Sequence, residues 1–182
     1  MAHQFMTSYL QDSIGLFRYY KQLGDRAIAQ CPDDKLVAQP SAESNSVATL
    51  VKHMTGNMIS RWTDFLTSDG EKPNRKRDTE FEEPPSTRSE ISVLWERGWK
   101  CMLEALESLS DADLTKTVTI RTEPHSVMQA INRQLGHYSY HVGQIVYVSR
   151  FFTGDDWKTL TIPKKKSEEF NTRVASGELS QR

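Results

Sequence analysis

The sequence has little cysteine. Cys31 and Cys101 are its only two cysteines, and neither belongs to a CxxC pair. A disulfide framework and a metal cage built from thiolates are therefore excluded. We expect both thiols to be buried and unreactive.

The chain also lacks an excess of charge of either sign. Its 23 Lys and Arg residues stand against 24 Asp and Glu residues, so the formal net charge is only -1. Proteins that bind nucleic acid usually carry a basic patch or stripe and a high pI, whereas the pI here is about 6.5. We therefore expect a small-molecule substrate or a protein partner, and no nucleic acid.

Long hydrophobic runs are absent as well. No segment approaches the roughly 20 apolar residues that cross a bilayer, and the first ten residues lack the charged and apolar regions of a signal peptide. These absences predict a cytoplasmic protein with no membrane partner. The sequence also contains no glycine-rich phosphate-binding motif and no nucleophile motif.

What the sequence does have is helical periodicity. The length of 182 residues suits a single domain spanning 1–182, and the hydrophobic fraction of 37% is enough for a core. Apolar residues recur at three- and four-residue spacing in four segments. We predict helices over residues 5–29, 47–66, 88–110 and 127–152.

The ends of these segments carry helix-terminating and helix-capping residues. Ser46 and Ser126 stand where N-caps are expected, and Thr87 forms a capping box with Glu90 three residues later. Gly154 is expected to stop the last helix. The fold class that follows is all-α, with a four-helix bundle as the expected architecture.

The segments between the helices lead to further expectations. Residues 67–86 are polar and rich in breakers, which predicts a loop of roughly twenty residues, a length that is often functional. The charge runs 75–77 and 164–166 are interpreted as solvated. Alternation between Leu114 and Thr122 predicts a short extended segment, which could form one arm of a small hairpin. The tail after Asp155 is expected to wrap the body without adding a core element.

Aromatic residues are interpreted as structural. Three of the four tryptophans lie on the helical stripes, so we expect core or dimer contacts from them in preference to a ligand cage. The four are Trp62, Trp95, Trp99 and Trp157.

Three histidines are candidate metal ligands. His137 and His141 lie four residues apart in one predicted helix, so both side chains can reach a single ion. His53 lies in the middle of another helix, among apolar residues, where an unpaired imidazole would be costly to bury. An antiparallel packing of the two helices would bring it opposite the pair. His3 and His125 fit this pattern less well and are expected at the surface.

Two polar residues share the faces of these histidines. Asn57 falls four residues after His53, and Gln144 falls three after His141. Either could orient a ligand or hold water, and either could equally make an ordinary hydrogen bond between helices.

Three imidazoles suit a borderline ion such as Zn²⁺ or Ni²⁺ and leave coordination positions open, as catalytic sites do. A metal at such a site can activate water or a thiol, so hydrolysis and sulfur transfer are both accessible. The rival interpretations are a non-catalytic metal-binding protein, with a fourth protein ligand, and a metal-free bundle whose histidines are hydrogen-bonded.

The sequence resembles the DinB-like superfamily over most of its length. The resemblance rests on His53, on the stretch 136–145 (GHYSYHVGQI), on the loop 69–73 (DGEKP) and on the closing segment 162–171. It is greatest to a bacterial branch of unknown activity, related to bacillithiol-dependent S-transferases.

This resemblance implies a four-helix bundle with an up-down-down-up course, a homodimer, and a divalent metal held by His53, His137 and His141. It also implies a low-molecular-weight thiol as a possible cosubstrate. We therefore expect a metal-dependent enzyme acting on a small molecule, a thiol S-transferase or a hydrolase. The alternative is a non-catalytic, metal-binding dimeric bundle.

Overall fold

The protein is mostly helical, with one small antiparallel sheet, in a computed structural model that describes residues 6–180. Within those residues the α-helices are α1 (Tyr9–Gln30), α2 (Val47–Trp62), α3 (Arg88–Glu107), α4 (Val127–Thr153) and α5 (Ser167–Ala175). The strands are β1 (Thr117–Ile120) and β2 (Glu123–Ser126). None of the described helices combines the length and the hydropathy that a membrane-spanning segment needs.

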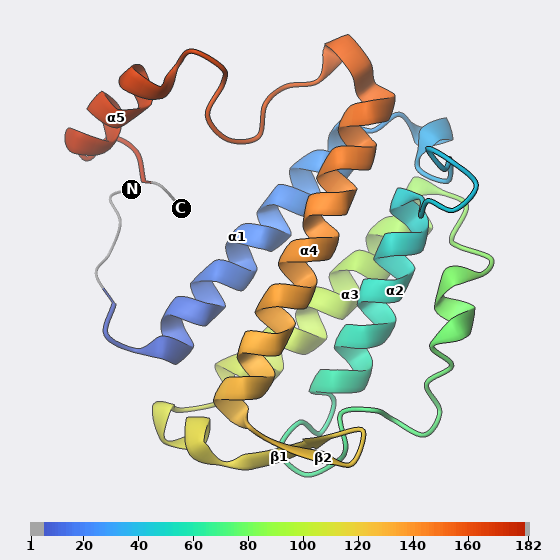
Figure 1. The fold of residues 1–182 in the computed structure, drawn as a ribbon, viewed down its shortest axis with the longest axis vertical. Coiled ribbons are helices and arrows are strands. Elements are labelled where there is room, and N and C mark those ends of the chain that lie inside the picture. The colour runs from blue at the N-terminus through green and yellow to red at the C-terminus, as the bar shows by residue number, and fades with distance from the viewer. Residues whose placement is uncertain (1–5, 181–182) are drawn as a thin grey trace.

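The four long helices lie side by side, as Figure 1 shows. The closest pairs are α2 with α3 and α1 with α4, and α2 also contacts α4. Helices α1 and α4 run in one direction, while α2 and α3 run in the other (Figure 1). The face shared by α2 and α4 carries the three candidate histidines.

Capping residues fix where these helices begin. The hydroxyl groups of Ser46 and Ser126 accept hydrogen bonds from the third backbone N–H of α2 and α4, as predicted. Thr87 and Glu90 form the predicted capping box at the start of α3. Gly154, at a φ of 61°, ends α4 as expected, because glycine adopts positive φ without strain.

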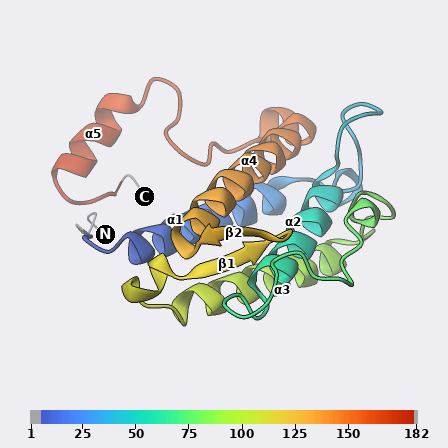
Figure 2. The ribbon, with the colours of Figure 1, turned by 60° about the horizontal axis from the view of Figure 1, so that its bottom comes forward.

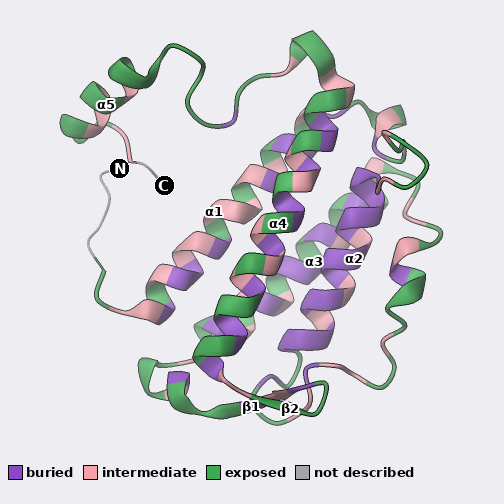
Figure 3. Ribbon diagram, in the orientation of Figure 1, coloured by how far each residue is buried: buried purple, intermediate pink, exposed green. Residues whose placement is uncertain are grey.

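The core lies between the four long helices. Most residues of α2 are buried in this core (Figure 3). Three of the four tryptophans are at most 3% exposed, and Trp157 packs against the core from its edge. The expectation that the tryptophans are structural is therefore confirmed. Of the two cysteines, Cys31 is buried and Cys101 is only half-buried.

A β-hairpin lies across one end of the helices (Figure 2). Val118 and Ile120 of β1 face the core, so the predicted extended segment is confirmed as one arm of a hairpin. Asp69 accepts hydrogen bonds from the backbone N–H groups of Arg121 and Thr122 in its turn, at 2.9 and 2.8 Å. These two hydrogen bonds tie the loop 67–86 to the hairpin.

Helix boundaries differ from the prediction by more than one residue in three places, one of which is the end of α3, at Glu107 instead of residue 110. Helix α2 ends at Trp62, because Thr63 is extended and Asp64 has a positive φ of 48°, so Phe65 and Leu66 lie outside it. Helix α1 begins at Tyr9, four residues later than expected, where Ser8 provides the cap. The predicted start at Phe5 lies outside the described residues.

The segment after α4 contacts the C-terminal end of α1 and then extends away from the other helices (Figure 1). Gln30 and Arg26 of α1 hydrogen-bond to the backbone of Lys158 and Leu160. The helix α5 was not predicted, but it buries no residue, so the tail adds no core helix. Its formation fits an acidic first turn and a basic last turn.

Candidate metal centre

The structure brings His53 of α2 together with His137 and His141 of α4. Their ligand atoms all lie within 4.8 Å of one another. The Nε2 atom of His137 is 3.4 Å from that of His53 and 3.1 Å from that of His141. His53 is 3% exposed and His141 is 9% exposed, so the cluster is largely shielded from solvent.

The hydrogen bonds at the other ring nitrogens determine where two of the imidazoles carry their protons. Nδ1 of His53 lies 2.8 Å from a carboxylate oxygen of Glu80, and Nδ1 of His141 lies 2.9 Å from the side-chain oxygen of Gln144. Both oxygens accept, so both Nδ1 atoms donate a proton. In the neutral rings, the Nε2 atoms of His53 and His141 therefore present lone pairs to the cluster.

These lone pairs have no satisfactory partner among the residues that the structure describes. If Nε2 of His137 carried a proton, it could donate that proton to Nε2 of only one neighbour, His53 or His141. Nε2 of the other neighbour would then face Nε2 of His137 without accepting a hydrogen bond. Such an arrangement is costly away from solvent. The site therefore suits a cation that accepts all three lone pairs.

The spacing of the nitrogen atoms also fits a metal. Zn–N bonds are about 2.0–2.1 Å, so two ligands in a tetrahedral site lie roughly 3.3 Å apart. The two contacts of His137, at 3.4 and 3.1 Å, are close to this value. Within the described residues, the cluster contains no fourth His, Cys, Asp or Glu, which leaves room for a further ligand.

Burial favours the neutral forms of His137 and His141. Burial, followed by the neighbouring His141 and His53, lowers the pKa of His137 from 6.5 to about 3. Burial also lowers the pKa of His141, although its hydrogen bond with Gln144 acts in the opposite direction. Neutral imidazoles are the form that binds metals, so His137 and His141 need not lose a proton first at neutral pH.

Glu80 links His53 to a buried ion-pair network. One of its carboxylate oxygens accepts from His53, and Arg75 donates to both oxygens at 2.7 and 2.9 Å. Arg75 also pairs with Glu71, which in turn pairs with Arg61 on α2. Burial would raise the pKa of Glu80, but the hydrogen bonds from His53 and Arg75 hold it below its ordinary value. Glu80 therefore stays ionised beside His53.

The backbone of α2 leaves space for this carboxylate. Gly56 lies three residues after His53, and a Cβ atom added there would come within 2.8 Å of the carboxyl carbon of Glu80. Phe81 packs on the His53 ring, with centroids 4.7 Å apart, and Arg77 lies over Phe81. The loop 67–86 thus contacts His53 through one charged residue, Glu80, and one aromatic residue, Phe81.

The two polar residues predicted to support the ligands have different surroundings. Gln144 hydrogen-bonds His141, as described above. Asn57 instead accepts from the hydroxyl of Tyr138, which accepts from the indole of Trp62. Asn57 thus makes the alternative interaction considered from the sequence, a buried hydrogen bond between helices.

The remaining histidines lie apart from the cluster. His125 lies in β2 and is half-buried, so it is less exposed than expected, and its Nδ1 lies 3.0 Å from the carbonyl oxygen of Glu123. His3 lies outside the described residues.

Sequence reasoning missed Glu80 and misassigned Arg75. The prediction of a solvated run at 75–77 is wrong for Arg75, whose side chain is 5% exposed because it pairs with Glu80 and Glu71. Lys76 and Arg77 are exposed, as are residues 164–166. The only available signal was the length of the loop 67–86, because nothing in its composition marks which acid reaches α2.

Comparisons with known proteins agree with this architecture. A family model described as "Protein of unknown function (DUF1572)" matches residues 4–166. A crystal structure of YjoA, a DinB-like protein from Bacillus subtilis, aligns with a TM-score of 0.62 and 14% identity, covering 81% of this chain and 96% of that chain. No curated protein matches the sequence. The predicted resemblance is confirmed, and the chain belongs to the DUF1572 family and has the DinB-like fold.

Proposed function

We propose that this protein is a divalent-metal-dependent enzyme acting on a small molecule, either a thiol S-transferase or a hydrolase. His53, His137 and His141 hold the metal, Zn²⁺ or Ni²⁺. The observation that carries the proposal is the set of Nε2 atoms that face one another while the Nδ1 protons of His53 and His141 are engaged elsewhere.

A divalent ion at this site supplies Lewis acidity, which lowers the pKa of a coordinated water or thiol. The protein's own residues set the geometry. Glu80 and Arg75 fix the ring of His53, and Gln144 fixes the ring of His141. Burial of the cluster limits the access of bulk solvent to the reacting group.

The lack of a fourth side-chain ligand among the described residues supports an enzyme over a structural metal site. Structural zinc sites are almost always closed by four protein ligands, whereas catalytic sites keep one position for water or substrate. The non-catalytic metal-binding protein remains the rival to be tested.

The wider proposal follows the family resemblance. The four long helices form a DinB-type four-helix bundle with an up-down-down-up course, and the whole chain is one domain. The protein acts in the cytoplasm as a homodimer, with a low-molecular-weight thiol as cosubstrate in the transferase case. Size-exclusion chromatography with light scattering tests the dimer directly.

Activity assays separate the two reactions. Zinc- and nickel-loaded protein is incubated with bacillithiol or another small thiol and the electrophile monochlorobimane, and separately with p-nitrophenyl acetate without thiol. Metal-dependent conjugation identifies a transferase, and metal-dependent hydrolysis identifies a hydrolase. His141→Ala is the matched negative control. Equal rates with loaded, stripped and variant protein in both assays would contradict an enzymatic role.

A further inference from the structure

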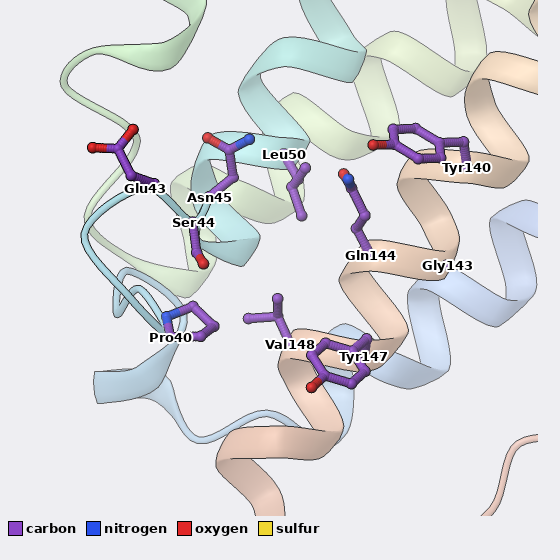
Figure 4. A pocket seen from close by; sticks show the side chains of 10 residues that line it. All are labelled: Pro40, Glu43, Ser44, Asn45, Leu50, Tyr140, Gly143, Gln144, Tyr147 and Val148. Carbon is purple, nitrogen blue, oxygen red and sulfur yellow. The ribbon is translucent and has the colours of Figure 1, made fainter.

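A pocket of about 480 Å³ lies beside the histidine cluster, in a groove between α2 and α4, and Gln144 connects the two. Leu50 lines it from α2, and Tyr140, Gln144, Tyr147 and Val148 line it from α4 (Figure 4). The segment 40–45, which precedes α2, forms its opposite wall. The volume is sufficient for a small organic molecule.

The pocket and the metal centre occupy adjacent levels of this groove. Leu50 lies three residues before His53 on α2, and Gln144 lies three residues after His141 on α4. Three helical residues correspond to a rise of about 4.5 Å. A molecule that fills the pocket therefore comes within one helical turn of the metal ligands.

Gln144 belongs to both sites. Its side-chain oxygen accepts the hydrogen bond from His141, which leaves its NH₂ group as a donor. In Figure 4 its side chain extends from α4 toward α2, between Tyr140 and Tyr147. A ligand that accepts a hydrogen bond from this NH₂ group would contact the side chain that orients His141.

The lining also indicates the kind of ligand. Tyr140 and Tyr147 are 64% and 68% exposed, and they flank Gln144 with aromatic surface, while Leu50 and Val148 are apolar. The ten described residues that line the pocket include no Lys, Arg or His, and Glu43 at the rim is their only charged member. An anionic head group would find no counter-charge here, whereas a cation would find two aromatic faces and one carboxylate.

We infer that this pocket binds the body of the substrate, and that the substrate is a flat, apolar molecule with a neutral or cationic hydrogen-bonding group. This inference rests on the proposed function, because it assigns the reacting end of the same molecule to the metal centre. Tyr140 and Tyr147 contact the apolar body. Gln144 donates to a neutral polar group such as a carbonyl, whereas a cationic group pairs with the carboxylate of Glu43.

A matched set of ligands tests the charge preference. Benzamide, benzylamine and benzoate carry neutral, cationic and anionic groups on the same ring. Their affinities for the full-length, metal-loaded protein are measured by ligand-observed NMR titration. We expect benzamide and benzylamine to bind, and benzoate to bind at least roughly tenfold more weakly, because its carboxylate would be desolvated without a partner. Equal binding of benzoate would overturn the inference.

A pair of variants tests the location. Tyr147→Ala should weaken benzamide binding by roughly two- to tenfold, the range expected for the loss of one aromatic contact. Phe151→Ala is the matched control, since Phe151 is exposed one turn further along α4 and does not line the pocket. Equal effects of both variants, or a Tyr147→Ala effect confined to dimer formation, would contradict the assignment.

The amide resonances of Gln144 and the metal content separate this inference from the proposed function. Benzamide should shift the side-chain NH₂ signals of Gln144 in both stripped and loaded protein, because the pocket itself contains none of the three histidines. Shifts without any stoichiometric metal would retain the pocket and reject the metal enzyme. Stoichiometric metal with unshifted Gln144 signals would reject the pocket alone.

Discussion

At the scale of single residues, Glu80 has the most specific role outside the three histidines. It accepts from His53 while its side chain is only 8% exposed, and Arg75 balances its charge. A carboxylate in this position makes the imidazole a stronger donor to a metal and fixes its orientation.

Replacing this charge should weaken the metal site without removing a ligand. We expect Glu80→Gln to lower the affinity for Zn²⁺ by about 10- to 100-fold, measured by competition with a chromophoric chelator. Glu82→Gln is the control, because Glu82 is exposed in the same loop. Equal Zn²⁺ affinities of Glu80→Gln and the native protein would show that the charge of Glu80 holds the loop in place and does not support the metal site.

The lowered pKa of His137 predicts how stability depends on pH when metal has been removed. Between pH 6.5 and about pH 3, the unfolded chain binds a proton at His137 that the folded protein does not bind. Stability is therefore fully present above pH 6.5 and decreases as the pH falls through this window. Urea unfolding at pH 7 and pH 5 measures the loss.

His137→Gln tests the assignment of this effect. The variant should lose less stability than the native protein between pH 7 and pH 5, although His141 contributes in the same direction because its pKa is also lowered. Glu80, whose pKa is lowered from 4.5, adds its own loss only at more acidic pH. If His137→Gln and the native protein lost the same stability between pH 7 and pH 5, a neutral, buried His137 would be contradicted.

The sequence predicts the ligands better than their supporting residues. His137 and His141 share one helix, so their spacing alone places them on one face, and His53 is conspicuous among apolar neighbours. Glu80 reaches His53 from 27 residues away through an irregular loop. No periodicity constrains such a loop, so the identity of this partner depends on the tertiary fold.

At the scale of helices, close packing depends on particular glycines. A Cβ added to Gly24 of α1 would lie 2.5 Å from the ring of Trp95 on α3, whereas one added to Gly15 of the same helix meets nothing within 4 Å. Alanine substitutions at these two positions should therefore change the stability of the protein in opposite directions.

We expect Gly24→Ala to destabilise the protein by about 1–3 kcal/mol, because Trp95 must move out of a filled core. Gly15→Ala should stabilise it by up to about 1 kcal/mol, since alanine is favoured over glycine inside a helix and its Cβ meets no neighbour here. Urea denaturation of both variants measures these changes. Similar effects of the two substitutions would contradict the described contact between α1 and α3.

Gly56 of α2 offers a related test of the metal site. Gly56→Ala should push the carboxylate of Glu80 away from His53, because the added Cβ overlaps that side chain. We expect a weaker affinity for Zn²⁺, with all three ligands intact, measured as for Glu80→Gln. Native affinity in a folded Gly56→Ala protein would contradict a close contact between Gly56 and Glu80.

Helix ends were predictable where side chains cap them locally. Thr87 with Glu90 and Ser126 with Gln129 make their bonds within four residues, so sequence alone contains both partners. The end of α2 was not predictable in the same way. Phe65 continues the apolar pattern, but the chain leaves the helix at Thr63 and Asp64 and buries Phe65 against Trp62.

At the scale of the whole molecule, metal binding should stabilise the fold, because the ligands come from α2 and α4 and the site exists only when these helices are packed. At a free metal concentration of about 100 times the dissociation constant, linkage gives about 2.7 kcal/mol. We expect the midpoint of thermal unfolding to rise by roughly 5–10 °C for a chain of this size. The variant His53→Ala, His137→Ala should show no such rise.

Elemental analysis tests the central claim most directly. Untagged native protein and the variant His53→Ala, His137→Ala are purified in parallel, and zinc, nickel and other divalent metals are quantified per chain. A shared site formed by His53, His137 and His141 predicts close to one divalent ion per native chain and its loss from the variant. Equal metal content in both proteins, or none in either, would contradict the metal site and leave a helical protein whose histidines serve packing.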